Sequence, residues 1–276
     1  MRRYLNLLGS VFLSLYKRLL NNSFKSKLVF RADYLIGLLF SFFFMFLQVF
    51  IWRGLYGSSG REIGGVVLNE MIAYTIFSGL VQMLTKSEVM TQINESVQDG
   101  SISMRLLLPI SFRKYYFMSN LSENLFGSIY NSLPPILISM LVFGIRVQIT
   151  LLNLSFFCLS VVLAILINFF FSFIFGLSVI IFKNAFFVEN LNELVFKLFS
   201  GTIVPMWFFP NWFNAASRFL PLRYIVFEPI SILLGKTPPE KIPHVLLAQL
   251  AWVFILWSLT SLVWARSRKH IMVQGG

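Results

Sequence analysis

Residues 34–52 read YLIGLLFSFFFMFLQVFIW and contain no charged side chain. The stretch lies between Asp33 and Arg53, and nearly all of its 19 residues are apolar. A helix needs about 20 mostly apolar residues to cross the hydrocarbon core of a bilayer. The stretch is therefore predicted to be a membrane-spanning helix, which makes an all-α membrane protein the starting hypothesis.

Five further stretches of low charge follow the first one along the chain. They run from about 66 to 85, 124 to 145, 154 to 182, 198 to 217 and 243 to 265. Each has about the length and hydrophobicity of a membrane span. The fold class predicted for residues 33–265 is therefore an all-α polytopic membrane protein with six transmembrane helices.

The composition of the 276-residue chain agrees with this hypothesis. Hydrophobic residues make up 57% and charged residues 12%, whereas soluble domains have roughly 45–50% and about 25%. These values argue against an ordinary soluble enzyme and against disorder, and the single cysteine, Cys158, excludes an internal disulfide. The net charge of +12 is better explained by basic cytoplasmic loops than by nucleic-acid binding, so no nucleic-acid partner is predicted.

The fifth stretch is irregular. Only 11 residues, 199–209, precede Pro210, and as a helix they reach about 16 Å, too short for a core of about 30 Å. Either the preceding residues 193–198 form part of the crossing, or the segment re-enters from the far side. Residues 205–235, with several prolines, are predicted to be re-entrant outer helices between spans five and six.

The distribution of Lys and Arg predicts the orientation. Six spans put both termini on one side, and that side carries 16 of the 23 basic residues, with Lys183 and Lys197 counted in an inner turn before span five. Cytoplasmic loops are enriched in Lys and Arg. Both termini are therefore predicted to be cytoplasmic, and residues 266–276 form a basic cytoplasmic tail.

Residues 1–32 have the pattern of a basic amphipathic helix lying on the membrane surface. Leucine and phenylalanine recur at steps of three and four from Leu5 to Leu19, and the basic residues lie mostly off that stripe. A signal peptide is the alternative interpretation. It is disfavoured because Lys17 and Arg18 end the apolar stretch early and no small-residue cleavage site follows.

The loop 86–116 is the longest predicted cytoplasmic connection. Val89, Ile93 and Val97 recur at four-residue spacing and so share one helical face, and Gly100 follows where a helix C-terminus favours a residue with positive φ. A short helix parallel to the membrane is predicted here. It serves either as a docking element, whose apolar face enters a groove on a partner, or as a solvated connector between two spans.

Three motifs resemble ABC-2 type exporter permeases, and together they cover nearly the whole chain. Residues 100–111, GSISMRLLLPIS, are similar to the run that follows the first coupling helix in that family. Residues 200–235, with a short fifth helix followed by outer re-entrant helices, are similar to a second hallmark. The opening of the first span, FRADY at 30–34, resembles a subgroup of bacterial permeases. Many members carry Glu three residues after the motif's glycine, whereas this chain has Ser103.

The resemblance implies the partners and the location. It implies two copies of an ABC ATPase subunit and a second permease chain, identical or homologous, in a bacterial cytoplasmic membrane among its lipids. The sequence contains no G-x-x-x-x-G-K-[ST] loop. No cofactor is therefore predicted in this chain; it is not expected to be an enzyme itself, and ATP and Mg²⁺ would bind the partner ATPase.

The resemblance also implies two sets of functional residues. The ATPase-coupling set combines the patterned helix with the motif after it: Val89, Ile93, Val97, Gly100, Leu106, Leu107 and Pro109. The outer gate or re-entrant set is Pro205, Trp207, Phe209, Pro210, Trp212, Pro221, Tyr224 and Glu228. Spans two and five from two chains would line a path that the outer set closes.

Other interpretations of the gate set stay open. Trp and Tyr belts are normal at membrane interfaces. Glu228 either lines the outer exit or bonds to nearby backbone. We expect an amphipathic substrate from the apolar character of the spans and from the family.

Two other classes of function remain as alternatives. An ATP-independent secondary transporter or channel is one, although proton relays usually place acids near the membrane midplane and the acids here are predicted at span ends. A membrane-embedded lipid-modifying enzyme is the other, although His244 and His270 have no clustered partners in the sequence.

Overall fold

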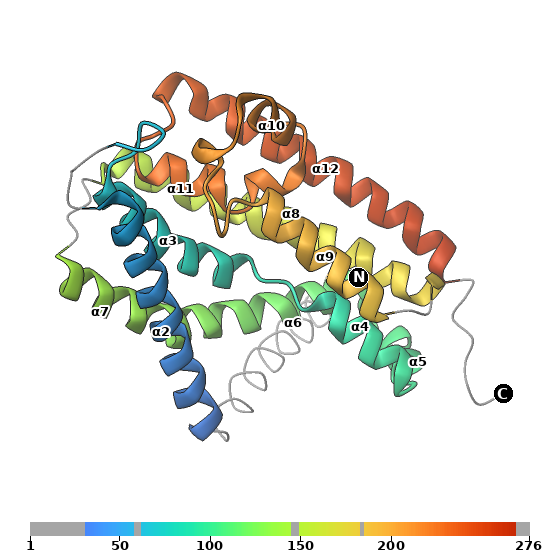
Figure 1. Cartoon of the computed structure of the whole chain (residues 1–276). Coiled ribbons are helices and arrows are strands. Elements are labelled where there is room, and N and C mark those ends of the chain that lie inside the picture. Colours follow the sequence, from blue (N-terminus) through green and yellow to red (C-terminus); the bar gives the residue numbers. More distant parts are fainter. Residues whose placement is uncertain (1–30, 58–61, 145–148, 183–184, 269–276) are drawn as a thin grey trace, which may run out of the picture.

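The computed structural model describes residues 31–57, 62–144, 149–182 and 185–268. Within these ranges the regular elements are helices, so the predicted all-α class is confirmed. The amphipathic helix predicted for residues 1–32 and the end of the basic tail, 269–276, fall almost entirely outside the described residues. Figure 1 shows the helices as an elongated bundle from which α2 (Arg31–Tyr56) diverges.

Four stretches of the described chain are long and apolar enough to cross a membrane. They are Leu35–Tyr56, Phe112–Phe143, Leu151–Ile181 and Pro239–Ser267. They correspond to α2, to the continuous α6 (Phe112–Gly127), η1 (Ser128–Ser132) and α7 (Leu133–Phe143), to α8 (Leu151–Phe182), and to η4 (Pro239–Lys241) with α12 (Ile242–Ser267). Two shorter helices, α3 (Leu68–Thr85) and α9 (Ala185–Phe199), lie beside them.

The uncharged helix α8 is the centre of the bundle. It packs against α12 along its length and also contacts α3, α9, the short helix α4 (Val89–Gln98) and the buried helix α11 (Phe227–Leu233). Phenylalanines carry much of this packing: Phe169 and Phe173 are buried and their ring centroids lie 5.6 Å apart. A helix apolar on all sides is expected at such a central position.

A π-turn interrupts the helix that runs from Phe112 to Phe143. It occupies η1, directly before Pro134 and Pro135. Proline has no N–H to donate, and its ring clashes with the carbonyl four residues earlier. The wider turn avoids that clash, because the Leu133 N–H bonds to the Ser128 carbonyl five residues back. The third predicted span therefore continues through both prolines.

The structure corrects the boundaries of the fifth span. The helix α9 begins at Ala185 and ends at Phe199, so residues 193–198 are helical and not a turn. The chain from 200 to 205 is not regular helix, so residues 198–217 do not form one continuous helix. Pro205 and Pro210 explain this, because each interrupts a helix that would pass through it.

The connection from α9 to α12 is a series of short helices. They are η2 (Met206–Phe208), α10 (Asn211–Ser217), η3 (Pro221–Tyr224) and α11. Every residue from 221 to 233 is buried. The second half of the connection is therefore packed into the bundle, whereas most residues from 210 to 219 are exposed.

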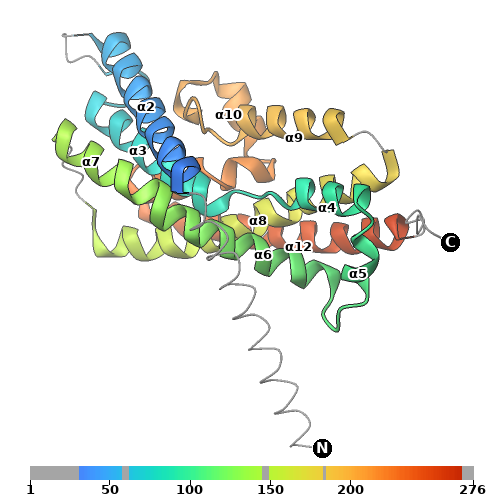
Figure 2. The ribbon, with the colours of Figure 1, turned by 90° about the horizontal axis from the view of Figure 1, so that it is seen from below.

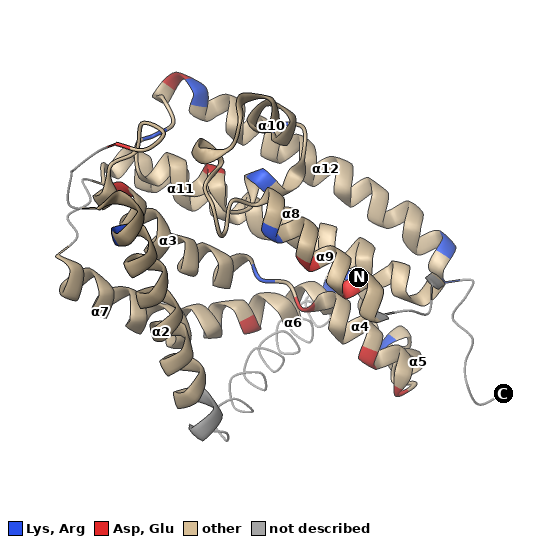
Figure 3. Cartoon of the chain, viewed as in Figure 1, with Lys and Arg blue, Asp and Glu red and all other residues tan. Residues whose placement is uncertain are grey.

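Charged side chains are segregated by element. Figure 3 shows long helices almost without charge, whereas α9, α4, the short helix α5 (Ile102–Leu106) and the start of α12 carry charges. The helices α4 and α5 lie at the end of the molecule where α12 finishes (Figure 1). Figure 2 shows α9 and α10 along one side and α6 and α7 along the other.

Candidate functional site

The apolar face of α4 is seated on α8. Val89 and Ile93 are fully buried, and Val97 packs against the same core. Gly176 of α8 permits the contact, because a Cβ there would lie 2.9 Å from Ile93 Cδ1 and 3.1 Å from Met90 Cα. The expectation that this face enters a partner's groove is therefore wrong for Val89 and Ile93, since neither is accessible.

The exposed apolar surface lies farther along the same segment. Leu107 is 85% exposed and Met104 is 73% exposed, and Leu106 and Pro109 are also exposed. Only Ile102 of α5 is buried. Met104, Leu106, Leu107 and Pro109 together form what we call the α5 tip. Three of the four belonged to the predicted coupling set, and Met104 was missed because no pattern distinguished it.

Polar contacts fix the orientation of the α5 tip. Arg105 Nη1 donates to the Tyr116 hydroxyl at 2.7 Å and to the Gln92 carbonyl at 3.3 Å. The Tyr116 hydroxyl also lies 2.9 Å from Ser96 Oγ of α4. At the turn, Gly100 has φ of +73°, as predicted, and the Ser101 N–H donates to Asp99 Oδ1. The tip is therefore held on α4 and α6.

Three buried asparagines hold the junction between α3 and α4. Asn120 and Asn124 come from α6 and Asn168 from α8. Asn124 donates to the carbonyls of Leu84 and Lys86, and Asn168 donates to the Thr85 carbonyl at 2.6 Å. Asn120 donates to the Lys86 carbonyl and accepts from the Glu88 N–H. We call these three residues the asparagine clamp.

The clamp satisfies backbone groups that the helices leave unpaired. The last carbonyls of α3 and the first N–H groups of α4 have no partners within their own helices. Buried without partners, such groups destabilise a fold. The clamp therefore allows an abrupt bend between α3 and α4 in the protein interior.

Replacing Asn124 with alanine is expected to destabilise the protein by about 1–3 kcal/mol, because the carbonyls of Leu84 and Lys86 lose the donor that this buried side chain supplies. Asn94→Ala is the control, since its amide bonds only to an exposed Gln98 and should cost less than about 0.5 kcal/mol. Thermal unfolding in detergent compares the two variants, and hydrogen exchange should rise at residues 84–88 only for Asn124→Ala. Equal shifts in both variants would contradict a role for the clamp.

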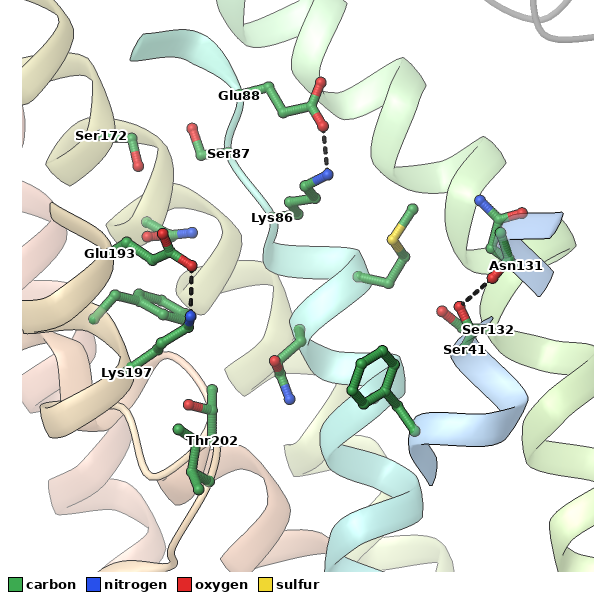
Figure 4. A pocket seen from close by; sticks show the side chains of 18 of the residues that line it. Ser41, Lys86, Ser87, Glu88, Asn131, Ser132, Ser172, Glu193, Lys197 and Thr202 are labelled. Atoms are coloured by element: carbon green, nitrogen blue, oxygen red, sulfur yellow. Dashed lines mark hydrogen bonds and ion pairs between the residues drawn. The ribbon is translucent and has the colours of Figure 1, made fainter. Parts of the chain in front are cut away.

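A cavity of about 1030 Å³ lies next to this junction. It is bounded by α2, α3, the start of α4, the η1–α7 region, α8 and α9 (Figure 4). Its neutral polar lining consists of Ser41, Gln48, Thr75, Gln82, Ser87, Thr91, Asn131, Ser132, Asn168, Ser172, Asn192 and Thr202. The lining is therefore far more polar than the apolar spans led us to expect.

Charged side chains also line the cavity, in two ion pairs. Lys86 pairs with Glu88 at the α3–α4 junction, and Lys197 pairs with Glu193 on α9 (Figure 4). Glu189 lies one turn before Glu193 and accepts a hydrogen bond from Thr91 Oγ1 at 3.4 Å. Lys197 was predicted to lie in an inner turn before span five. It lies instead on one face of α9 together with Glu189 and Glu193, so Lys197 no longer counts with the inner loops.

Aromatic side chains of α2, α3 and the connection after α9 pack against one another. Trp207 packs edge-on against Tyr74 of α3 and against Phe227, and Phe208 stacks on Trp52 of α2 at 5.5 Å. The Tyr74 hydroxyl donates to the Gly201 carbonyl at 2.7 Å. Trp207 therefore belongs to a layer that also contains Phe208 and Tyr74, neither of which was in the predicted gate set.

The other predicted gate residues occupy different environments. Phe209 stacks on Phe213, whose ring stacks in turn on Phe199. Trp212 is 72% exposed and meets only the edge of Phe213 within this cluster. Pro205 and Pro221 are buried, and the exposed Pro210 precedes α10. Trp212 and Pro210 are therefore not part of the aromatic layer.

A buried ion pair stabilises the connection. Arg223 Nε donates to Glu228 at 2.6 Å, and the two side chains are 7% and 10% exposed. Arg223 also donates to Asn214 and Ser217 and lies over the Phe227 ring at 4.8 Å. Tyr224 donates to the Arg218 carbonyl, and Gln249 of α12 donates to the Tyr224 carbonyl. Glu228 therefore pairs with a side chain, which neither predicted interpretation included.

Comparison of the sequence with known protein families assigns the chain to one of them. A family model described as ABC-2 family transporter protein matches residues 42–275. The chain belongs to this family. As an ABC-2 permease it is a multi-pass membrane protein and a component of a transport system. No curated protein matches the sequence.

Several functional features of the permease lacked a sequence signal. The clamp asparagines are separated by up to 48 positions and lie in stretches without a motif. Glu70 pairs with Lys236, 166 positions away, at 2.6 Å. Such contacts depend on which helices become neighbours. Only the row of Glu189, Glu193 and Lys197, at four-residue spacing, could have been recognised in the sequence as one helical face.

Proposed function

We propose that this ABC-2 permease is the membrane subunit of an ABC exporter and forms the translocation path for an amphipathic substrate. A separate ATPase subunit supplies the energy. The observation that carries the proposal is the α3–α4 junction: Lys86, Ser87 and Glu88 line the cavity, and the helix that follows leads to the exposed α5 tip. A force applied at the tip therefore has a short path to the cavity wall.

The proposed topology has six spans: α2, α3, α6–α7, α8, α9 and α12. As helices, α3 and α9 reach about 27 Å and 22 Å, so α9 needs the short helices after it to complete the crossing. Residues 205–235 then enter the membrane from the outer side and return. Basic residues favour a bacterial cytoplasmic membrane with both termini in the cytoplasm, residues 1–32 on its inner surface and 266–276 as a tail.

The proposed assembly contains two copies of the ATPase and a second permease chain, identical or homologous. ATP and Mg²⁺ bind the ATPase, since this chain has no phosphate-binding loop. The cavity, between α3 and α9, would form one half of a central path. The aromatic layer of Trp207, Phe208 and Tyr74 would close that path on the outer side.

The α5 tip is the surface that we propose for ATPase docking. Exposed apolar side chains at the end of a polar helix favour a protein partner over water. Val89, Ile93 and Val97 would act indirectly, by holding α4 on α8, and Gly100 by forming the turn that directs the tip. Movement of the tip would then reach the cavity through α4 and the clamp.

Replacing Leu107 with aspartate is expected to weaken co-purification of the ATPase by about tenfold or more, because a charge would be buried in an apolar contact. Gln98→Asp introduces the same charge at an exposed position of α4, away from the tip, and should leave association unchanged. Affinity purification from membranes followed by quantification of ATPase per permease provides the measurement. Undiminished association of Leu107→Asp would reject the tip as the docking surface.

A further inference from the structure

The charges in the cavity are arranged as internally compensated pairs. Lys86 has Glu88 and Lys197 has Glu193, while the other polar lining residues, apart from Glu189, are neutral hydroxyls and amides. The side chains of both pairs are between 44% and 61% exposed. Both pairs are therefore open to exchange with a ligand in the cavity, unlike the buried pair of Arg223 and Glu228.

Compensated pairs discriminate between kinds of ligand charge. A ligand with a single charge can bind one member of a pair only by displacing the other, which then loses its partner. A zwitterion exchanges both partners at once, so its ammonium meets the carboxylate and its anionic group meets the lysine. The lining therefore favours a ligand with both charges over either singly charged ligand.

The charged side chains on α9 also determine the orientation in which a zwitterionic ligand would bind. The backbone positions of Glu193 and Lys197 are four residues, about 6 Å, apart along the helix axis, which is comparable to the charge separation in a phosphocholine or phosphoethanolamine group. In the structure the two charged groups bend toward each other and pair at 2.5 Å, so a zwitterionic headgroup would bind by separating them. Glu189 adds a second carboxylate on the same face of α9. The ammonium of the ligand would therefore lie toward Glu189, with its anionic group at Lys197.

Apolar contacts are available next to Lys197. Phe196 and Ile203 line the cavity from the same wall as Lys197, and Phe44 lines it from α2. An alkyl chain attached to the anionic group would lie against these side chains. The cavity thus matches the two ends of an amphiphile.

We propose that the cavity binds a zwitterionic amphiphile and that the α9 pair Glu193–Lys197 recognises its headgroup. This inference rests on the proposed function. The ligand carries an ammonium, an anionic group about one helical turn away, and an apolar chain on the anionic side. This names the substrate class of the path without requiring that transport be measured.

The test compares probes that share one chain and differ in headgroup. Dodecylphosphocholine, dodecyltrimethylammonium and dodecyl phosphate are mixed at equal concentration with the purified permease complex in a maltoside detergent. Native mass spectrometry then counts the retained adducts. We expect the zwitterionic adduct to exceed each singly charged one by about tenfold, the factor expected for one charge-assisted contact. Equal retention of the three probes would overturn the proposal.

Matched variants assign the preference to the α9 pair. Lys197→Met should shift retention toward dodecyltrimethylammonium by about tenfold, and Glu193→Gln should shift it toward dodecyl phosphate. The reversed double variant Glu193→Lys/Lys197→Glu keeps the pair and should keep the zwitterionic preference, which also controls for folding. Unchanged ratios in both single variants would contradict the role of the pair.

Two further results distinguish an amphiphilic ligand from a soluble one, and the proposed transport function from the proposed headgroup preference. Free phosphocholine lacks the chain and should not be retained; retention equal to that of dodecylphosphocholine would overturn the amphiphile and indicate a soluble ligand. Binding needs no ATPase, so a complex that keeps the zwitterionic preference but shows no ATP-driven transport would reject the proposed function alone. Transport without that preference would reject this inference alone.

Discussion

Replacing Arg223 with methionine is expected to lower the free energy of unfolding by about 3–5 kcal/mol, the largest effect of any single substitution that we predict. The variant leaves the Glu228 carboxylate buried without its cation, and Asn214 and Ser217 lose their donor. Methionine keeps an unbranched apolar side chain in place of the arginine stem, so the change removes mainly the charge and the guanidinium donors. The measurement is thermal unfolding of the purified permease in detergent.

The exposed pair on α9 provides the control. Lys197→Met also removes one cation from a carboxylate, but both side chains there are more than half exposed. An exposed pair of this spacing contributes about 0.3–0.5 kcal/mol. The double variant Arg223→Met/Glu228→Gln should recover part of the loss, because no buried charge remains. An Arg223→Met variant within about 1 kcal/mol of the parent protein would show that the pair is not a stabilising contact.

Replacing Gly176 with alanine is expected to destabilise the protein by about 1–3 kcal/mol and to displace α4 from α8. The added methyl would meet Ile93 Cδ1 at 2.9 Å and, more importantly, the Met90 backbone at 3.1 Å. A side chain can rotate away, but the backbone can retreat only if the helix moves. Hydrogen exchange at residues 89–98 should therefore increase, and ATPase turnover should become less dependent on substrate.

Gly37 of α2 is the matched control for this substitution. It is also a helical glycine, but no atom lies within 4 Å of its added Cβ. Alanine is a better helix former than glycine by about 1 kcal/mol, so Gly37→Ala should be neutral or stabilising. The two substitutions are therefore expected to change the free energy of unfolding in opposite directions. Combining Gly176→Ala with Ile93→Val removes the nearest atom and should restore part of the stability, and a stabilising Gly176→Ala would contradict close packing of α4 on α8.

The sequence predictions were correct where they depended on a single segment or a single residue of the chain. The apolar stretches predicted the long helices, because hydrophobicity and length act within one segment. Gly100 was predicted at a turn because positive φ is a property of a single residue. The face of α4 was also recognised, but not its partner: apolar spacing shows that a face is buried and cannot show against which surface.

The fifth span failed for a related reason. Lys197 was placed in an inner turn, since charges are costly in a membrane. In the structure Lys197 lies with Glu189 and Glu193 on one face of α9, where all three line a polar cavity and Lys197 pairs with Glu193. A cavity between helices removes the penalty that the sequence rule assumes, and the rule has no information about cavities.

The sequence by itself determined that this protein is an all-α membrane protein of the ABC-2 type, because hydrophobic length, charge distribution and motif order are written along one dimension. Only the tertiary structure decided that α4 rests on α8, that three asparagines hold its junction with α3, and that Arg223 neutralises Glu228. These features depend on which helices are neighbours. That choice is made by packing among many apolar surfaces that are nearly equivalent in sequence but differ in shape.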